Sequence, residues 1–213
     1  MEKLNNFYEK FPGSYVAYIG FVFSIAFITI AAILYSDSVS TFSLLTTYIS
    51  DLGAASRDSS LVFAVGMIIS APIRVLFGFY LLKYLESCGA DNKTLKRTAK
   101  AVVVGAIGST VLAIFPHDVF RFGHMMGSLV YFVSVVIIQI NISKLELRIE
   151  SIPKYLPTIG LFVVVSYVAF LTFEISEIIF EGFRYVAIVL EWLAYFVLMA
   201  WLVMHGYYIQ RVK

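Results

Sequence analysis

The residues best suited to chemistry in this chain are acids, histidines and arginines that lie inside or beside long apolar segments. An ionisable group within a membrane segment costs at least about 2.5–3.5 kcal/mol on insertion scales, so each one is a candidate for function. Glu191 is the clearest case, because residues 188–190 and 192–194 are all apolar. The other candidates near the ends of these segments are Asp51, His117, Asp118, Arg121, His124, Glu174, Glu177, Glu181 and Arg184.

Carboxylates and imidazoles of this kind suit acid–base chemistry or metal binding. Catalytic zinc usually has three His, Asp or Glu ligands and an open position for water. His117, His124 and Asp118 are the candidate ligands, with Asp51 or Glu177 as further carboxylates. However, His117 and His124 are about two helical turns apart, too far for one ion unless His117 lies in a turn that folds back. The sequence therefore predicts no cofactor, with a metal ion as the weaker alternative.

His205 lies near the opposite end of the last apolar segment, ~20 Å from Glu191 along a helix axis. This depth excludes a centre of three histidines, and we expect His205 to lie at the membrane interface. A haem between paired histidines is disfavoured for the same reason, because the three histidines do not fall at matched depths. We therefore expect a polar layer in one half of the protein only.

Residues 116–131 place polar side chains at helical spacing. If a helix begins near Pro116, which suits a first-turn position, its polar stripe should face the protein interior rather than lipid. Asp118 would then lie in the first turn, where the helix dipole favours an acid, so a helix-start role is as good an interpretation as a catalytic one. The stripe comprises His117, Arg121, His124, Ser128 and Tyr131.

Three acids and one arginine leave alternatives open. Glu174 and Glu177 would lie in the last turns of a helix, where the dipole opposes them. Either Arg121, Arg184, a metal ion or a raised pKa offsets them, or they are solvated. Glu191 is expected to pair inside the protein. Arg74, near the middle of an apolar segment, either extends toward the cytoplasm or meets Glu191 or another interior acceptor.

The composition indicates an integral membrane protein. Of 213 residues, 60% are hydrophobic and 14% are charged, whereas a soluble domain carries about 25% charged residues. The net charge of +2 is too small to predict nucleic-acid binding. Cys88 is the only cysteine, so an intramolecular disulfide and a cysteine-based metal site are both excluded.

Six segments are long enough to cross a bilayer, which predicts an all-α six-helix bundle in a single membrane domain, 1–213. Lys and Arg gather in alternate connections, so we expect both termini to be cytoplasmic and the protein to lie in the cell membrane. In the first outer connection, the sequence up to Gly53 predicts a short interfacial helix, with an ordinary loop as the alternative. The expected spans are 14–35, 61–85, 99–115, 122–142, 155–180 and 185–209.

Two short motifs lie in the outer connections of this expected topology. Residues 49–53 read I-S-D-L-G, and residues 115–118 read F-P-H-D, followed by H-M-M-G at 124–127. In these motifs the chain resembles a prokaryotic six-span family known as domain of unknown function 998. The resemblance implies six helices and a shared outer polar site that includes Ser50, Asp51, Pro116, Asp118 and His124. It implies no activity.

Three functions are compatible with these observations. The leading hypothesis is a site that binds or modifies a membrane lipid or small polar ligand. If it is catalytic, Asp51, Asp118, His124 and Glu177 would be its central groups, with His124 or an acid as general base. The ligand-binding set would add Ser50, His117, Arg121, Glu174, Glu191 and Arg74. The alternative is a non-catalytic accessory subunit that contacts other membrane-protein subunits, and a small transporter is a third, weaker hypothesis because the acids do not appear at several depths.

Overall fold

The computed structural model of the chain describes residues 2–38 and 41–212, and it confirms an all-helical architecture with six long apolar helices. Met1, Val39, Ser40 and Lys213, which belong to the predicted domain 1–213, lie outside the described residues. Within the described residues, six helices are long and apolar enough to cross a bilayer, so the chain is a multi-pass membrane protein. The elements are α1 (Glu2–Lys10), α2 (Gly13–Ser38), η1 (Ser50–Gly53), α3 (Ser60–Ser87), α4 (Asn92–Ile114), α5 (Arg121–Leu147), α6 (Tyr155–Phe180) and α7 (Arg184–Val212).

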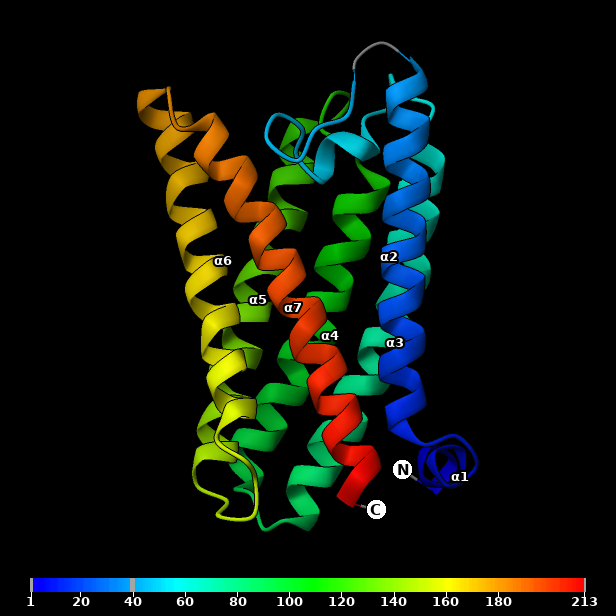
Figure 1. Cartoon of the computed structure of the whole chain (residues 1–213), viewed down its shortest axis with the longest axis vertical. Helices are drawn as coiled ribbons and strands as arrows, with labels where there is room; N and C mark the ends of the chain where they lie inside the picture. Colours follow the sequence, from blue (N-terminus) through cyan, green and yellow to red (C-terminus); the bar gives the residue numbers. More distant parts are fainter. Residues whose placement is uncertain (1, 39–40, 213) are drawn as a thin grey trace.

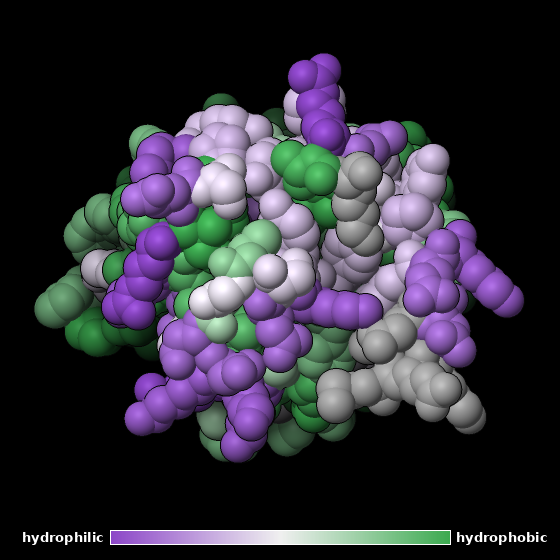
Figure 2. Space-filling model, turned by 90° about the horizontal axis from the view of Figure 1, so that it is seen from below, coloured by the Kyte–Doolittle hydropathy of each residue, from purple (hydrophilic) through white to green (hydrophobic). Residues whose placement is uncertain are grey.

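The six long helices form a closed ring in chain order. Each one packs beside the next, and α7 returns to pack against α2 (Figure 1). Both described chain ends lie at one end of the ring, which we call the terminus end. The opposite end carries η1 and the α4–α5 and α6–α7 connections, and we call it the η1 end. Figure 2 views the terminus end directly, and hydrophilic side chains cover much of that face.

Small residues allow α4 and α5 to approach closely. A Cβ atom at Gly108 would lie 2.7 Å from the backbone nitrogen of Tyr131, and one at Gly127 would lie 2.5 Å from that of Leu112. Both distances are shorter than a side chain tolerates, so glycine is required at these two positions. The contact explains why the H-M-M-G sequence ends in glycine, and it makes Gly108 a helix-contact residue.

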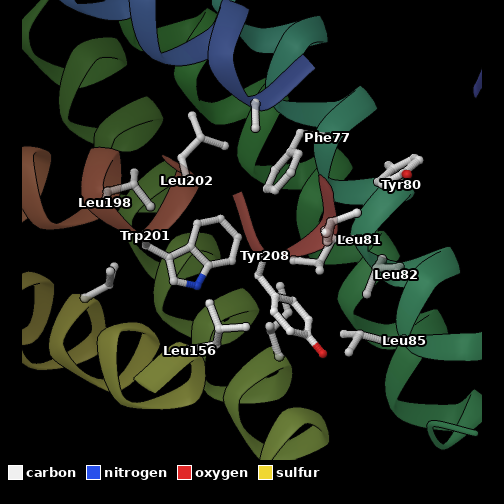
Figure 3. Packing of buried hydrophobic residues seen from close by; sticks show 14 of the residues in the cluster. Phe77, Tyr80, Leu81, Leu82, Leu85, Leu156, Leu198, Trp201, Leu202 and Tyr208 are labelled. Atoms are coloured by element: carbon white, nitrogen blue, oxygen red, sulfur yellow. The ribbon is translucent and has the colours of Figure 1, made fainter. Parts of the chain in front are cut away.

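The buried side chains form two clusters along the length of the ring. At the η1 end the cluster includes Leu52 of η1, Phe63 and Trp192. At the terminus end a larger cluster surrounds Trp201 and Tyr208, with residues of α3 and α6 packed about them (Figure 3). Polar groups interrupt both clusters, and these groups decide what the protein can do.

Three features differ from the sequence expectation. The helix in the first connection is a single 3-10 turn, Ser50–Gly53, because the preceding residues fold as turns rather than as an amphipathic helix. The fourth span begins at Arg121, one residue before the expected start at 122, so the helix start near Pro116 that was considered for the polar stripe does not hold, and His117 lies in a turn. The helix α1 was not expected. It docks through Tyr8, whose buried hydroxyl donates to the Leu76 carbonyl at 2.7 Å.

Candidate functional site: a cavity at the η1 end

A cavity of about 720 Å³ occupies the interior of the ring in its η1 half. Side chains from α2, α3, α4, α5, α6 and α7 line it, and residues 48–51 close it from the η1 side. Its size lies within the range of about 300–1,000 Å³ that is typical of small-molecule sites. Its polar lining residues include Ser50, Asp51, Arg74, His117, Arg121, His124, Glu174, Arg184 and Glu191.

The cavity reaches the protein surface between α5 and α6. Several apolar side chains of these two helices line the cavity and are also exposed, which places them at an opening. Both helices are long and apolar enough to cross a bilayer, so the opening lies between two candidate membrane spans. The residues are Phe122, Met125, Met126 and Leu129 on α5 and Ile175 and Ile178 on α6.

Asp51 is the centre of the polar wall near the η1 end. Its Oδ2 accepts a hydrogen bond from the backbone nitrogen of Tyr48 at 3.0 Å, which fixes the carboxylate within its own turn. Its Oδ1 lies 3.3 Å from His117 Nε2, and Arg184 approaches Oδ2 to 3.6 Å. The contact with Asp51 raises the pKa of His117 above its usual value, although partial burial acts in the opposite direction.

Glu191 and its neighbour Trp192 bind the first connection to the last helix. The Glu191 carboxylate is buried, and it accepts a hydrogen bond from the backbone nitrogen of Ile49 at 2.7 Å. The Trp192 indole donates to the Thr47 carbonyl at 2.8 Å. A loop at membrane depth must have its backbone polar groups satisfied by the protein, and α7 supplies these partners. Glu191 therefore pairs inside the bundle as expected, but with a backbone group.

Asp118 has a similar anchoring role outside the cavity. Its two carboxylate oxygens accept hydrogen bonds from the backbone nitrogens of Ala55 and Ser56, at 2.9 and 3.0 Å. The small desolvation of this side chain acts to raise its pKa, but the two backbone hydrogen bonds outweigh it and lower the pKa below the usual value. Asp118 is exposed and does not line the cavity, so it ties the α4–α5 turn to the first connection.

His124 presents one basic nitrogen. Its Nδ1 lies 3.1 Å from the Leu112 carbonyl oxygen and 2.9 Å from that of Phe115. Carbonyl oxygens only accept, so Nδ1 carries the proton and Nε2 is the unprotonated nitrogen of the neutral ring. Because His124 lines the cavity, Nε2 is available as a hydrogen-bond acceptor or a general base. The His117 and His124 rings are 5.7 Å apart, because the turn before α5 does fold back.

Glu174 and Glu177 have different surroundings despite their sequence proximity. Glu174 lines the cavity, and its Oε2 is buried without a hydrogen-bond partner among the described residues. Burial, and then the Glu174 carboxylate, raise the pKa of the nearby Tyr48 hydroxyl. Glu177 accepts from the backbone nitrogen of Phe183 at 2.6 Å and does not line the cavity. This bond holds the α6–α7 turn, in which Glu181 and Gly182 have positive φ angles of 55° and 92°.

Arg74 is a cation in the middle of α3 that faces the cavity floor. It donates to the hydroxyls of Ser70 at 2.6 Å and Ser109 at 2.7 Å, and its guanidinium lies 5.6 Å from the Tyr131 ring centre. Ser70 precedes Arg74 on α3, which starts at the η1 end, so the Arg74 side chain extends toward the η1 end. This direction is contrary to the expectation that Arg74 extends toward the end that carries the termini. Glu191 is directed to Ile49 instead, and among the side chains that the structure describes no carboxylate forms an ion pair with Arg74.

The expectation of a polar layer in only one half of the protein is wrong. His205 is 1% exposed rather than interfacial, and its Nε2 lies 2.8 Å from Oε1 of Glu146, which is equally buried. Both residues lie in the terminus half of the ring. Sequence reasoning missed Glu146, although the spacing of Gln139, Ser143 and Glu146 places all three polar groups on one face of α5 and could have revealed them.

The arrangement of the acids and histidines also bears on a metal site. Over the described ranges, no three His, Cys, Asp or Glu side chains are grouped closely enough to hold a metal ion. Asp118 is occupied by backbone hydrogen bonds, and His117 faces Asp51. With the side chains in these positions, the cavity wall presents charges and hydrogen-bonding groups to an organic ligand.

The fold and cavity define a six-span helical membrane protein with a ligand-sized cavity that opens between α5 and α6. The chain belongs to the family described as Protein of unknown function (DUF998), whose pattern matches residues 18–208. That range includes all the cavity-lining residues and the Glu146–His205 pair. No curated protein matches the chain. No solved structure matches it either.

Proposed function

We propose that this protein binds an amphiphile with an anionic head group, which enters from the outer leaflet of the cell membrane. The observation that carries the proposal is the continuity of the cavity, from an apolar opening between α5 and α6 to a polar interior with the Arg74 guanidinium at its floor. An acyl chain fits the apolar opening, and a phosphate or carboxylate fits a guanidinium, which donates two parallel hydrogen bonds to such groups.

The assignment of the outer leaflet follows from the charge distribution. Lys83, Lys93, Lys96, Lys144 and Arg148 lie at or near the terminus ends of the helices, whereas the η1 end has few basic residues. Positive residues favour the cytoplasmic side, so the η1 end faces outward and both termini are cytoplasmic. The opening between α5 and α6 then lies at the depth of the outer leaflet.

Arg74 is the residue on which the ligand class depends. A charge at this depth is costly unless it has a partner, and two serine hydroxyls offer dipoles rather than an opposite charge. The buried Tyr195 hydroxyl, which also lines the cavity, has no hydrogen-bond partner among the described residues. An anionic head group would satisfy both side chains at once.

The test compares three probes with the same dodecyl chain: dodecyl phosphate, dodecylphosphocholine and dodecyl maltoside. Each is titrated below its critical micelle concentration into the full-length protein in lipid nanodiscs, and binding is measured by native mass spectrometry. Dodecyl phosphate should bind most tightly. Arg74→Gln should weaken it about tenfold or more, since a hydrogen bond to a charged group contributes about 1.5–3 kcal/mol. Arg74→Lys should retain part of the affinity.

A steric variant tests the entrance independently. Leu129→Trp adds bulk to an exposed residue that lines the cavity, and it should reduce binding of all three probes. Ile107→Trp is the matched control, because Ile107 is an exposed residue of α4 that does not line the cavity. Equal binding of the three probes, unchanged by Arg74→Gln and Leu129→Trp, would contradict the proposal.

Two other functions remain to be compared with this one. An accessory subunit predicts polar groups paired with one another around no cavity, so the cavity favours ligand binding. A proton-coupled carrier is the second candidate, because the Glu146–His205 pair puts an acid in the terminus half, on the far side of buried apolar residues such as Val135, Val163 and Leu198. Release of bound dodecyl phosphate to the opposite face of sealed vesicles would favour the carrier.

A further inference from the structure

A second cluster of polar side chains lies outside the cavity, between α5, α6 and α7 in the terminus half. Gln139, Ser143, Glu146, Trp201 and His205 are each at most 6% exposed. None of the five lines the cavity at the η1 end. A group of polar side chains this deeply buried in a membrane bundle is costly unless every donor and acceptor has a partner.

The protein itself does not supply all of those partners. Within the described part of the chain, Gln139 Oε1, Ser143 Oγ, Glu146 Oε2 and Trp201 Nε1 are buried and make no hydrogen bond. The set includes acceptors, one donor and one hydroxyl that can do both. Four such atoms in one cluster are far more than native interiors usually leave unsatisfied.

Three of these atoms converge on one point of α6. A Cβ atom at Gly160 would overlap Ser143 Oγ and would lie 3.3 Å from Gln139 Oε1 and 3.6 Å from Trp201 Nε1. The absence of a side chain at Gly160 is therefore what leaves room for the three polar groups. Figure 3 shows the Trp201 indole and its ring nitrogen beside the buried side chains of Leu156, Leu198 and Leu202.

The adjacent Glu146–His205 pair holds a proton between its two members. His205 Nδ1 lies 2.8 Å from the Trp201 carbonyl oxygen, which can only accept, so Nδ1 carries a proton. His205 Nε2 lies 2.8 Å from Glu146 Oε1, and this contact requires one further proton, on either the imidazole or the carboxyl group. The pair is therefore neutral overall in both forms, while Glu146 Oε2 remains an open acceptor.

We propose that this cluster is an internal hydration site, in which at least one water molecule bridges Gln139, Ser143 and Trp201 beside the proton shared by Glu146 and His205. Water both donates and accepts, so it can take the Trp201 hydrogen bond and donate to Gln139 or Glu146. Buried waters typically make about three hydrogen bonds to groups that the protein leaves unsatisfied. The site is independent of the amphiphile cavity.

Hydroxyl-radical footprinting by synchrotron X-rays tests the site in the full-length protein in nanodiscs. Radicals form at bound water, so a buried side chain beside water is oxidised while a dry one is not. Trp201 should be oxidised, with its rate normalised to that in the unfolded protein. Phe77 is the matched control, because it is 3% exposed and packs edge-on against Trp201 with ring centres 5.8 Å apart.

Two variants connect the signal to these residues. Gly160→Ala/Ser143→Ala fills the point of convergence with methyl groups, and it should abolish Trp201 oxidation. Gln139→Leu keeps the side-chain size but removes the acceptor, and it should reduce the oxidation even if the first variant fails to fold. Trp201 oxidation as low as that of Phe77 in the unmodified protein would overturn the proposal, and so would oxidation that persists unchanged in a folded variant.

Discussion

Three carboxylates at the η1 end and one at the terminus end have different kinds of hydrogen-bond partner. At the η1 end, Glu191, Asp118 and Glu177 each accept hydrogen bonds from backbone nitrogens of a connection. At the terminus end, Glu146 pairs with the side chain of His205, and no loop takes part. The difference indicates two purposes. Acids at the η1 end shape irregular backbone around a cavity, whereas the acid at the terminus end joins α5 to α7.

The comparison also separates acids that hold the fold from acids available to a ligand. Asp118 and Glu177 have their partners outside the cavity, so they position its walls without lining it. Asp51, Glu174 and Glu191 line it directly, together with Arg74. The site available to a ligand is therefore smaller than the set of ionisable residues in the η1 half.

The largest effect is expected from breaking the buried pair. Glu146→Ala leaves His205 without its partner at 1% exposure, and the loss of one member of a buried pair costs about 3–5 kcal/mol in free energy of unfolding. Thermal unfolding in detergent measures it. Glu146→Gln is the control, because the amide can still donate to Nε2. An alanine variant as stable as the parent protein would mean that the pair is not formed.

A smaller effect is expected at the η1 end, where the partner is a backbone group. Glu191→Leu leaves the Ile49 nitrogen without an acceptor, which costs about 1–3 kcal/mol. Glu191→Gln should be nearly neutral, because its amide oxygen can accept the same hydrogen bond. If the glutamine variant loses as much stability as the leucine variant, the negative charge itself matters and the comparison between the two ends changes.

Trp192→Phe should lower the stability by a still smaller amount, and its structural effect should be confined to residues near Thr47. The variant keeps the aromatic packing but loses the hydrogen bond to the Thr47 carbonyl, worth about 1 kcal/mol. We expect faster hydrogen exchange at residues 47–51 and no change at the Glu146–His205 pair. Uniformly faster exchange over the whole ring would argue against a local anchor.

The smallest effect is a pH dependence confined to the η1 end. The folded-state pKa of His117 is raised by Asp51, so the contact stabilises the protein below the usual histidine pKa, and this contribution is lost as pH rises through the raised value. The stability of the parent protein and of His117→Gln should therefore converge between neutral and alkaline pH. Parallel stability curves over the whole range would show that His117 does not titrate against Asp51.

The sequence was sufficient for the architecture and for the acids, histidines and arginines of the cavity wall. Apolar length determined the six spans, and polar residues inside apolar segments indicated Arg74 and Glu191. The partners could not be predicted, because they are backbone nitrogens of a connection without regular structure, as Ile49 and Ala55 show. The position of His117 was also out of reach, since it depends on where α5 begins.

Glu146 and His205 were misjudged for a different reason. Both fall close to the ends of their helices in the sequence, where charged residues usually meet water, and only packing shows that α5 and α7 bury them. Sequence position gives depth along one helix, but burial depends on which other helix covers that depth. Whether a polar residue near the end of a span is buried or exposed can therefore be judged only once the packing of the helices is known.

The ring is closed, because the last helix packs against the first spanning helix. The same arrangement of helices should therefore form even if the chain begins and ends at a different connection. Gly206 of α7 leaves no room for a side chain against Ala17 of α2, and the Tyr18 hydroxyl donates to Gln210 at 3.0 Å. The helices α2 and α7 are therefore in direct contact although no loop connects them. A circular permutant that joins residue 212 to residue 2 through a flexible linker and opens the chain at Gly182 should assemble the same ring.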